Sequence, residues 1–406
     1  MKKTIKLAIA TALALSTTAA YATNGSTMLA VGVKARGMGG VGIGMSHGSE
    51  SVLSNPALIT NVQSTEISFG GTLFMPDVEN TNTWNAAATA QTATSDADQF
   101  VIPSVSLVTK VNDNFYTGVG LWGTGGLGVD YRKTPVATGN SQMQMVTSLQ
   151  IMQFGVPLVY TEDSFSIGIT PLLQYGVLDI NYNSTGTNSV GAGVGSDLSF
   201  GYNLGLSYSI DDITIGAIYK SKISMSYDGQ LPAALKGFGI AAYTNDGLDT
   251  PSELGIGLSY KLGEHTFAVD YKNIQWSDAK GYQDFGWEDQ DVVSLGYEYS
   301  AGGWAARLGY SKANSAVKDN KGKTLPQAAI GLNAAVANTF NALGFPGNIE
   351  EHYTAGMTYD FTDMVSLDLA YVYAPEQKLS ITNAYGQPMS FKHSETSYSA
   401  AINLAF

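Results

Sequence analysis

The sequence predicts an all-β protein, a transmembrane antiparallel β-barrel of about fourteen strands with an N-terminal plug inside the lumen. Three observations predict it. Segments with apolar residues at every second position recur along the chain, tight polar turns alternate with long connections, and a glycine-rich segment precedes the first alternating one. Because successive side chains of a strand point to opposite faces, the alternating segments are strands with one apolar face.

The last ten residues, Ser397 to Phe406, are the clearest of these segments. One face of this segment carries Tyr398, Ala400, Ile402, Leu404 and Phe406. A transmembrane barrel closes on such a strand, with an aromatic residue at the membrane boundary. A soluble β-sandwich can end in the same way, so this segment alone leaves both folds open.

The chain contains fourteen segments of this kind, an even number as in bacterial barrels. They are Thr65–Phe74, Phe100–Val111, Phe115–Tyr131, Met145–Tyr160, Phe165–Tyr182, Ser199–Ile210, Ile213–Asp228, Ser252–Leu262, His265–Ser277, Asp291–Ser300, Trp304–Val317, His352–Phe361, Val365–Ile381 and Thr396–Phe406. The last segment is expected to pair with the first and close the barrel.

Short and long connections alternate strictly between these segments, which favours a barrel over a sandwich. Tight polar turns such as Asp211-Asp212 and Gly263-Glu264 are followed by long connections such as Gly229–Pro251 and Lys318–Glu351. In an antiparallel meander this order places the short turns at one rim and the long loops at the other. Outer-membrane barrels show this asymmetry, with periplasmic turns and external loops.

The N-terminus resembles a secretory signal peptide, residues 1–22. Lys2 and Lys3 precede the apolar stretch Leu7 to Leu15, and Ala20 to Ala22 supplies small residues for cleavage. The apolar stretch is shorter than the roughly 20 residues that a spanning helix needs. We therefore expect residues 23–62 to form the plug, residues 63–406 the barrel, and the outer membrane of a Gram-negative bacterium to be the location.

Composition excludes several classes of function. The chain has no cysteine, 46 glycines, 23 tyrosines and only 14% charged residues, against about 25% in ordinary proteins. Its formal charge of −13 becomes −16 when Lys2, Lys3 and Lys6 leave with the signal peptide. This acidity argues against nucleic acid as a partner.

Charged residues within the predicted strands fall on the lumen face, since their neighbours are apolar. A Lys or Arg on the lipid face would cost about 2 to 4 kcal/mol near the membrane midplane. Lys222, Lys272 and Arg307 are therefore candidates for holding the anionic head group of a ligand. The alternative is that they are hydrated, or paired with acidic residues such as Asp270 and Glu298.

The segment before the first strand is rich in glycine and lacks strand alternation. Gly37, Gly39 and Gly42 match a G-x-G-x-x-G pattern. A dinucleotide site would need a strand before this pattern and a helix after it, and neither is predicted here. No cofactor is expected, and tight packing inside the lumen is the preferred interpretation.

A series of short motifs runs in order across the mature chain. They begin with Ala35-Arg36-Gly37-Met38-Gly39-Gly40 and Asn55-Pro56-Ala57, and continue with Ser199-Phe200-Gly201-Tyr202-Asn203, Pro251-Ser252-Glu253-Leu254-Gly255 and Arg307-Leu308-Gly309-Tyr310. Together these motifs resemble the FadL family of outer-membrane transporters for long-chain fatty acids and other hydrophobic compounds. The resemblance implies a monomeric barrel plugged by a hatch, with Asn55, Pro56 and Ala57 as the hatch motif. It also implies capture at external loops, a lumen pocket, and lateral exit at a kinked third strand.

The third predicted strand is crowded with glycine, which marks bulges and bends. Gly123, Gly125 and Gly126 are the candidates for the kink and the lateral opening. The family often carries a Pro-Phe-Gly type of sequence here, and this chain has Leu121-Trp122-Gly123 instead. The kink is therefore expected, with its geometry open.

Two long external loops are apolar, and exposed apolar patches commonly mark interaction sites. Leu235, Phe238, Phe340, Leu343 and Phe345 are candidates for an external ligand groove. The alternative is that these loops pack on one another over the barrel mouth.

The sequence does not predict an enzyme. Its four histidines lie in no catalytic or metal-binding motif. A water-filled porin or a surface adhesin remains an alternative to a transporter. The expected partners are a hydrophobic ligand, outer-membrane lipid and, through the C-terminal strand, the barrel-assembly machinery.

Overall fold

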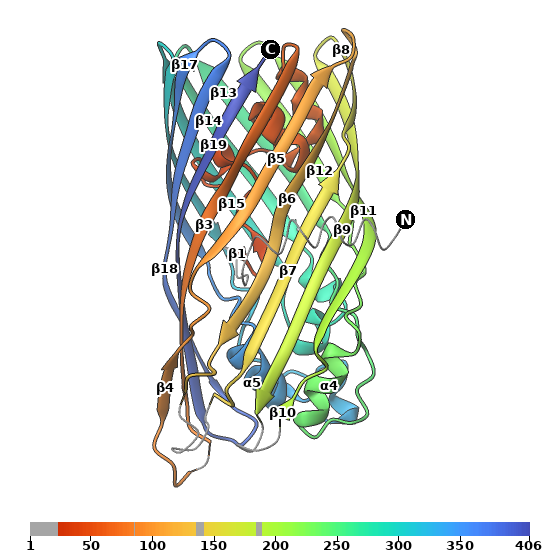
Figure 1. The fold of residues 1–406 in the computed structure, drawn as a ribbon, viewed down its shortest axis with the longest axis vertical. Helices are drawn as coiled ribbons and strands as arrows, with labels where there is room; N and C mark the ends of the chain where they lie inside the picture. The colour runs from red at the N-terminus through yellow and green to blue at the C-terminus, as the bar shows by residue number, and fades with distance from the viewer. Residues whose placement is uncertain (1–22, 85, 135–141, 184–188) are drawn as a thin grey trace.

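The computed structural model describes residues 23–84, 86–134, 142–183 and 189–406, so the predicted signal peptide lies outside the described residues. The chain forms a closed antiparallel barrel of fourteen strands, which slant around the lumen (Figure 1). The all-β barrel predicted from sequence is therefore confirmed.

The wall strands are β3 (Thr65–Asn82), β5 (Phe100–Lys110), β6 (Phe115–Asp130), β7 (Val146–Gly155) continued by β8 (Leu158–Glu162), β9 (Phe165–Asn183), β11 (Val194–Ile210), β12 (Ile213–Lys220), β13 (Glu253–Leu262), β14 (His265–Ile274), β15 (Gln290–Ala301), β16 (Trp304–Ala313), β17 (Glu351–Thr362), β18 (Val365–Thr382) and β19 (Pro388–Ala405). The short strands are β1 (Thr23–Asn24), β2 (Thr27–Met28), β4 (Gln91–Thr94) and β10 (Ser189–Val190).

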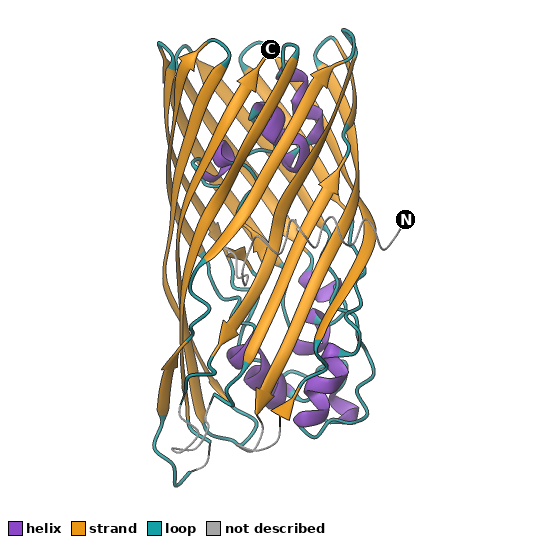
Figure 2. Ribbon diagram, viewed as in Figure 1, coloured by secondary structure: helices purple, strands orange, loops and turns teal. Residues whose placement is uncertain are grey.

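Two groups of helices accompany the barrel, one inside its upper half and one at its lower rim as drawn in Figure 2. The first group comprises α2 (Val33–Arg36), η1 (Gly48–Glu50), α3 (Ser51–Ser54) and η2 (Pro56–Asn61). The second comprises α4 (Gln230–Gly237), α5 (Ala334–Gly344), η4 (Trp276–Asp278), η5 (Tyr282–Phe285) and η6 (Ala328–Ile330). Among the described residues, no helix is both long and apolar enough to cross a membrane.

The barrel closes where the last strand meets the first. β19 pairs with β3 from Ala405 opposite Glu66 to Met389 opposite Asn82, and the backbone N–H of Phe406 donates to the carbonyl of Thr65 at 2.9 Å. The C-terminus lies at the rim that carries the short turns (Figure 1). Both features agree with the closing role predicted for the C-terminal segment.

Several strand boundaries differ from the predicted ones. β3 runs to Asn82 and β19 begins at Pro388, each eight residues beyond the predicted limit. In β19 the extension carries Lys392 and Ser394 where a lipid face would carry apolar residues, so the alternation fades. The fourth wall strand is interrupted before β8 because Pro157 lacks the N–H that continues a ladder.

The segment after Lys220 is not a regular strand, although the sequence predicted one to Asp228. Within it, Ile223 and Ser226 form isolated bridges to Thr250 and Gly247. Tyr227 is buried in the apolar cluster beneath the long loops. The alternating apolar residues of the segment after Lys220 therefore pack under the long loops, and the segment is not a strand of the barrel wall.

The outer face is apolar and is bounded by aromatic pairs, as in a membrane-spanning barrel. Near the short turns Tyr359 packs on Phe361 with ring centroids 5.2 Å apart, and farther along the strands Tyr310 packs on Tyr353 at the same distance. Between these levels, apolar side chains such as Ile256 are exposed.

Depth in the membrane should decide the cost of a charge on this face. We expect Ile256→Arg to lower the free energy of unfolding by about 2 to 4 kcal/mol, and Leu262→Arg at the rim by about 0 to 1 kcal/mol. Urea unfolding in lipid vesicles measures both. Equal costs would contradict the placement of Ile256 within the apolar band.

Candidate functional site

We define residues 23–62 as the hatch. Its helices lie inside the half of the barrel that carries the short turns (Figure 2), while its first residues reach the long-loop side, where Ser26 Oγ lies 2.9 Å from Tyr282 Oη. Its backbone lies directly on glycines of the wall. A Cβ atom added to Gly309 would lie 2.0 Å from the backbone nitrogen of Gly39, and one added to Gly216 would lie 1.8 Å from the carbonyl oxygen of Ile43. Any side chain at these two wall positions would therefore collide with hatch backbone.

These wall glycines form a seat for the hatch, on strands β11 to β13 and β15 to β17. The hatch seat comprises Gly205, Gly216, Gly257, Gly296, Gly309 and Gly356. Gly216 pairs with Gly257 and Gly296 pairs with Gly309, so each pair leaves a flat stretch of wall. The sequence analysis missed this role, although lumen-phase glycines recurring in successive strands were a detectable signal.

Asp270 on β14 fixes the glycine-rich loop of the hatch to the wall. Its Oδ2 accepts hydrogen bonds from the backbone N–H groups of Gly42 and Ile43, both at 2.7 Å, and its Oδ1 accepts one from Gly44 at 3.2 Å. Three donors on one buried carboxylate compensate its loss of water. The G-x-G-x-x-G-like stretch thus binds a carboxylate of the wall.

The hatch motif ties a turn of the hatch to β11, three strands away from Asp270. Asn55 donates from Nδ2 to the carbonyls of Ile43 at 2.8 Å and Leu206 at 3.0 Å. Its Oδ1 accepts from Ala57 N–H at 3.1 Å and caps η2, where Pro56 occupies the first helical position.

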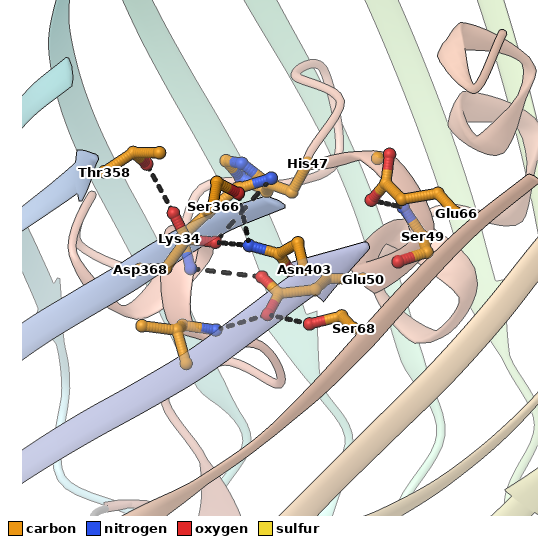
Figure 3. Close-up of polar contacts among 12 residues, drawn as sticks. Lys34, His47, Ser49, Glu50, Glu66, Ser68, Thr358, Ser366, Asp368 and Asn403 are labelled. Atoms are coloured by element: carbon orange, nitrogen blue, oxygen red, sulfur yellow. Dashed lines mark hydrogen bonds and ion pairs between the residues drawn. The ribbon is translucent and has the colours of Figure 1, made fainter. Parts of the chain in front are cut away.

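A second set of buried charges links the hatch to strands β17 to β19 (Figure 3). Lys34 Nζ lies 3.7 Å from Asp368 Oδ2, and Asp368 also accepts from Thr358 and Asn403. Glu50 of the hatch accepts from the backbone N–H groups of Val33 and Lys34, each at 3.1 Å. We call Lys34, Glu50 and Asp368 the hatch latch.

His47 and Arg307 lie beside the hatch latch. Burial lowers the pKa of His47 to about 4, so its ring is neutral at physiological pH and adds no charge. Arg307 donates from Nε to Glu298 at 2.6 Å and from Nη1 to Thr358 at 2.7 Å. Its guanidinium is thus paired at the hatch, on the side of the lumen near the short turns.

A lumen pocket lies between the N-terminal part of the hatch and the wall. Its apolar lining includes Met28, Leu29, Leu53, Ile151, Leu172, Ile218, Ile223 and Val292. Lys220 lies 3.1 Å from Glu253 in this pocket, and Lys272 also lines it. Within the part of the chain that the structure describes, Lys272 forms no ion pair.

Of the three predicted head-group candidates, Lys272 alone lines the lumen pocket. Lys222 donates to Asp278 at 2.8 Å on an exposed part of the loops, and Arg307 belongs to the surroundings of the hatch latch. The alternation of apolar residues in the strand correctly predicted that Arg307 faces the lumen. It could not predict where along the barrel axis Arg307 lies.

The third wall strand, β6, is bulged at the predicted glycines. Gly123 pairs with Met152 and Gly125 with Ile151, so Thr124 is an extra residue in the ladder to β7. The ladder from β6 to β5 ends at Trp122 opposite Ser104. Beyond this point, Gly126 N–H donates to the carbonyl of Ser26 in the hatch at 2.8 Å.

The long external loops pack into a cap over the lumen, which we define by α4, α5, η5 and residues 345–349. Phe340 and Phe285 stack with centroids 4.6 Å apart. The predicted groove residues Leu235, Phe340, Leu343 and Phe345 are buried, and Phe238 is partly buried against them. The packing alternative is therefore observed, and a role in ligand capture requires these loops to separate.

The comparison with known families decides the identity of this fold. The family described as outer membrane protein transport protein (OMPP1/FadL/TodX) matches residues 10–326. The chain belongs to this FadL/TodX family. FadL/TodX proteins are transport proteins of the outer membrane, which places this barrel there and does not suggest an enzyme.

Individual relatives agree with this assignment. The chain is 23% identical to the long-chain fatty acid transport protein of Escherichia coli O6:H1 over 94% of its length and 93% of the relative's. It is 24% identical to the 47 kDa outer membrane protein of Pasteurella multocida over 90% of this chain and 92% of that one.

Solved structures share the fold. The toluene transporter TodX of Pseudomonas putida matches 93% of this chain and 99% of its own, with a TM-score of 0.67 at 17% identity. A FadL homologue from Pseudomonas aeruginosa matches 94% of this chain and 100% of its own, with the same TM-score at 14% identity.

The hatch seat predicts what a single added methyl group would do. Gly309→Ala should displace the hatch, because its Cβ would overlap the backbone of Gly39. We expect a steady ion conductance in planar bilayers where the unaltered protein conducts little.

The matched control is Gly71→Ala on the lipid face, where the nearest atom to the new Cβ is the carbonyl oxygen of Ile102 at 3.0 Å. Barrel formation is followed by the heat-dependent shift on gel electrophoresis. A Gly309→Ala barrel that forms and stays closed would show that the hatch does not depend on this contact.

Proposed function

We propose that this protein takes up hydrophobic small molecules, with long-chain fatty acids as the first candidate substrate. The ligand is captured at the external cap, enters the lumen pocket and leaves sideways through the wall at β6. The observation that carries this proposal is that the bulge residue Thr124 and Gly125 also line the lumen pocket. Pocket and wall defect are therefore continuous.

The wall beside the bulge supports a lateral route. Phe100 and Ile102 on β5 pair with β3 but not with β6, so this edge of the sheet lacks its second partner. The gap is bounded on the loop side by the hydrogen bond from Asp96 N–H to the carbonyl of Asp130, at 2.8 Å. Unpaired strand edges are avoided in a membrane unless other groups satisfy them.

The N-terminal part of the hatch satisfies this edge. The carbonyl of Ser26 accepts from Gly126, Thr27 pairs with Gly125, and Met28 packs with Phe74 and Phe100 in a small apolar cluster. We infer that this is the closed state of the exit and that residues 26–28 must shift for a ligand to pass. The rest of the hatch stays on its seat.

Thr124 offers a direct test of the exit. Deleting it would remove the bulge and leave Gly125, Leu127 and Val129 on the lumen face, because the bulge shifts the alternation by one residue. β6 could then continue its ladder with β5. We expect uptake to fall at least tenfold, while ligand binding to the purified protein and membrane assembly persist.

Thr124→Ala is the control, since it keeps the extra residue and should retain uptake. Bulky residues at Gly125 and Gly126 should also reduce uptake without blocking assembly. Normal uptake by the Thr124 deletion would rule out exit at this strand.

The lining of the lumen pocket favours a ligand with an apolar body and one anionic group. Lys220 is paired with Glu253, and Asp270 is occupied by three hatch N–H groups, which leaves Lys272 to meet a carboxylate. Apolar burial contributes roughly 25 cal/mol per Å². The fatty acid transport protein from Escherichia coli is a relative of this chain, which supports the same class of ligand.

A neutral aromatic hydrocarbon is the second candidate, supported by the fold shared with the toluene transporter TodX. Lys272→Ala separates the two. Losing a charged hydrogen-bond partner costs about 1.5 to 3 kcal/mol, so fatty acid affinity should fall by about tenfold or more while toluene affinity is unchanged.

Lys222→Ala is the matched control, because it removes the same charge outside the pocket. Tryptophan fluorescence titration of the purified protein measures both affinities. Unchanged fatty acid binding by Lys272→Ala would reject Lys272 as the head-group partner and favour the neutral ligand.

A water-filled porin is the less supported alternative, because a seated hatch and an apolar cap would obstruct ion flow. An adhesin is supported only by the long loops. A monomeric state and recognition of the C-terminal strand by the barrel-assembly machinery remain part of the proposal.

A further inference from the structure

Three neutral side chains form a hydrogen-bonded relay that begins and ends at the lumen pocket. Gln153 of β7 donates from Nε2 to Oε1 of Gln174 on β9 at 2.8 Å, and Gln174 donates from Nε2 to Oγ1 of Thr250 at 2.8 Å. Gln153 and Thr250 line the pocket, while Gln174 is fully buried behind them. We call these three residues the amide relay.

Both ends of the amide relay keep an unused hydrogen-bonding group. Within the described part of the chain, Oε1 of Gln153 accepts no hydrogen bond, and the hydroxyl of Thr250 accepts from Gln174 but donates to no group. Turning both amides over exchanges donors for acceptors along the relay and leaves the same two ends unfilled. The pocket therefore presents one donor and one acceptor that the protein itself does not occupy.

An unsubstituted alkyl chain would leave these two ends without partners. Gln153 is only 8% exposed, so a ligand that fills the pocket removes the remaining water from its amide. Loss of water without a new hydrogen bond weakens binding by about tenfold for one neutral group. A site with such groups discriminates in favour of a ligand that carries a hydroxyl and against the analogue that lacks it.

The amide relay lies away from the proposed head-group partner, Lys272. Strands β9, β11, β12 and β13 stand between β7, which carries Gln153, and β14, which carries Lys272. Both residues nevertheless line the same pocket. A ligand that reaches both therefore needs a carboxylate at one end and a second polar group farther along its chain.

We propose that the amide relay is a hydroxyl-binding subsite, and that the preferred ligand is a long-chain fatty acid with a hydroxyl group on its chain. A hydroxyl both donates and accepts, so it can bind at either end of the relay whichever way the amides face. A keto group only accepts and suits only the donor end. This inference rests on the proposed function, because it names the ligand of the same pocket.

Stearate and a set of monohydroxylated stearates, with the hydroxyl at different carbons, test the subsite. Tryptophan fluorescence titration of the purified full chain in detergent micelles gives the Kd of each. We expect at least one isomer to bind about tenfold more tightly than stearate, the effect of one added hydrogen bond. If stearate binds and no isomer binds more tightly, the subsite is rejected and the proposed function stands. If none of these acids binds, both fail.

Gln153→Leu and Thr250→Val should each reduce the preference for the hydroxylated acid. Both changes remove a hydrogen-bonding end of the relay, and Thr250→Val keeps the two backbone hydrogen bonds between Thr250 and Ile223. We expect the ratio of the two Kd values to fall towards one in at least one variant. A relay that only holds the wall together would change both affinities and leave their ratio unaltered. A preference retained by both variants would therefore overturn the proposal.

Gln150→Leu is the matched control, because it makes the same change on the opposite face of β7, outside the pocket. It should leave both affinities and their ratio intact. Lys272→Ala should weaken the binding of both acids and keep the ratio, since the relay lies on other strands. Loss of the preference in either of these variants would show that the hydroxyl is not recognised at the relay.

Discussion

The hatch lies backbone against backbone on the wall of the barrel, and its other contacts depend on this close approach. Hydrogen bonds and charges can hold the hatch only because the wall lacks side chains where Gly39, Ile43 and Gly44 lie. A Cβ on Gly257 would lie between Asp270 and the backbone N–H of Gly44, and one on Gly309 would collide with the backbone of Gly39. The hatch latch and the hatch motif then fix position on a surface that is already complementary.

The lumen charges are divided between two tasks. Asp270, Asp368 and Arg307 face hatch groups or one another, while Lys272 faces the pocket. This division lets the barrel keep a polar interior without giving the pocket a large net charge. It also explains why a strand position facing inward is weak evidence for ligand binding, since most such groups already have protein partners.

The sequence was sufficient for the fold because the membrane imposes a strict alternation on every strand that it contacts. That constraint ends outside the bilayer, so the outer parts of β3 and β19 could not be found by alternation. The bulge region was anticipated from glycine, but the extra residue, Thr124, depends on pairing with β7. Asp270 and Arg307 were placed on the correct face, while their partners depend on where the hatch lies along the barrel axis.

Because the ladders differ in length, neighbouring strands are not held together equally strongly around the barrel. β19 and β3 join the two ends of the wall through more than twice as many residue pairs as β6 shares with β5. Tension around the circumference, from thermal fluctuation or from a ligand wedged in the lumen, is therefore released at the short ladder first. The seam between β19 and β3, which joins the two ends of the wall, is held by the longer ladder and is therefore harder to part than the ladder between β5 and β6.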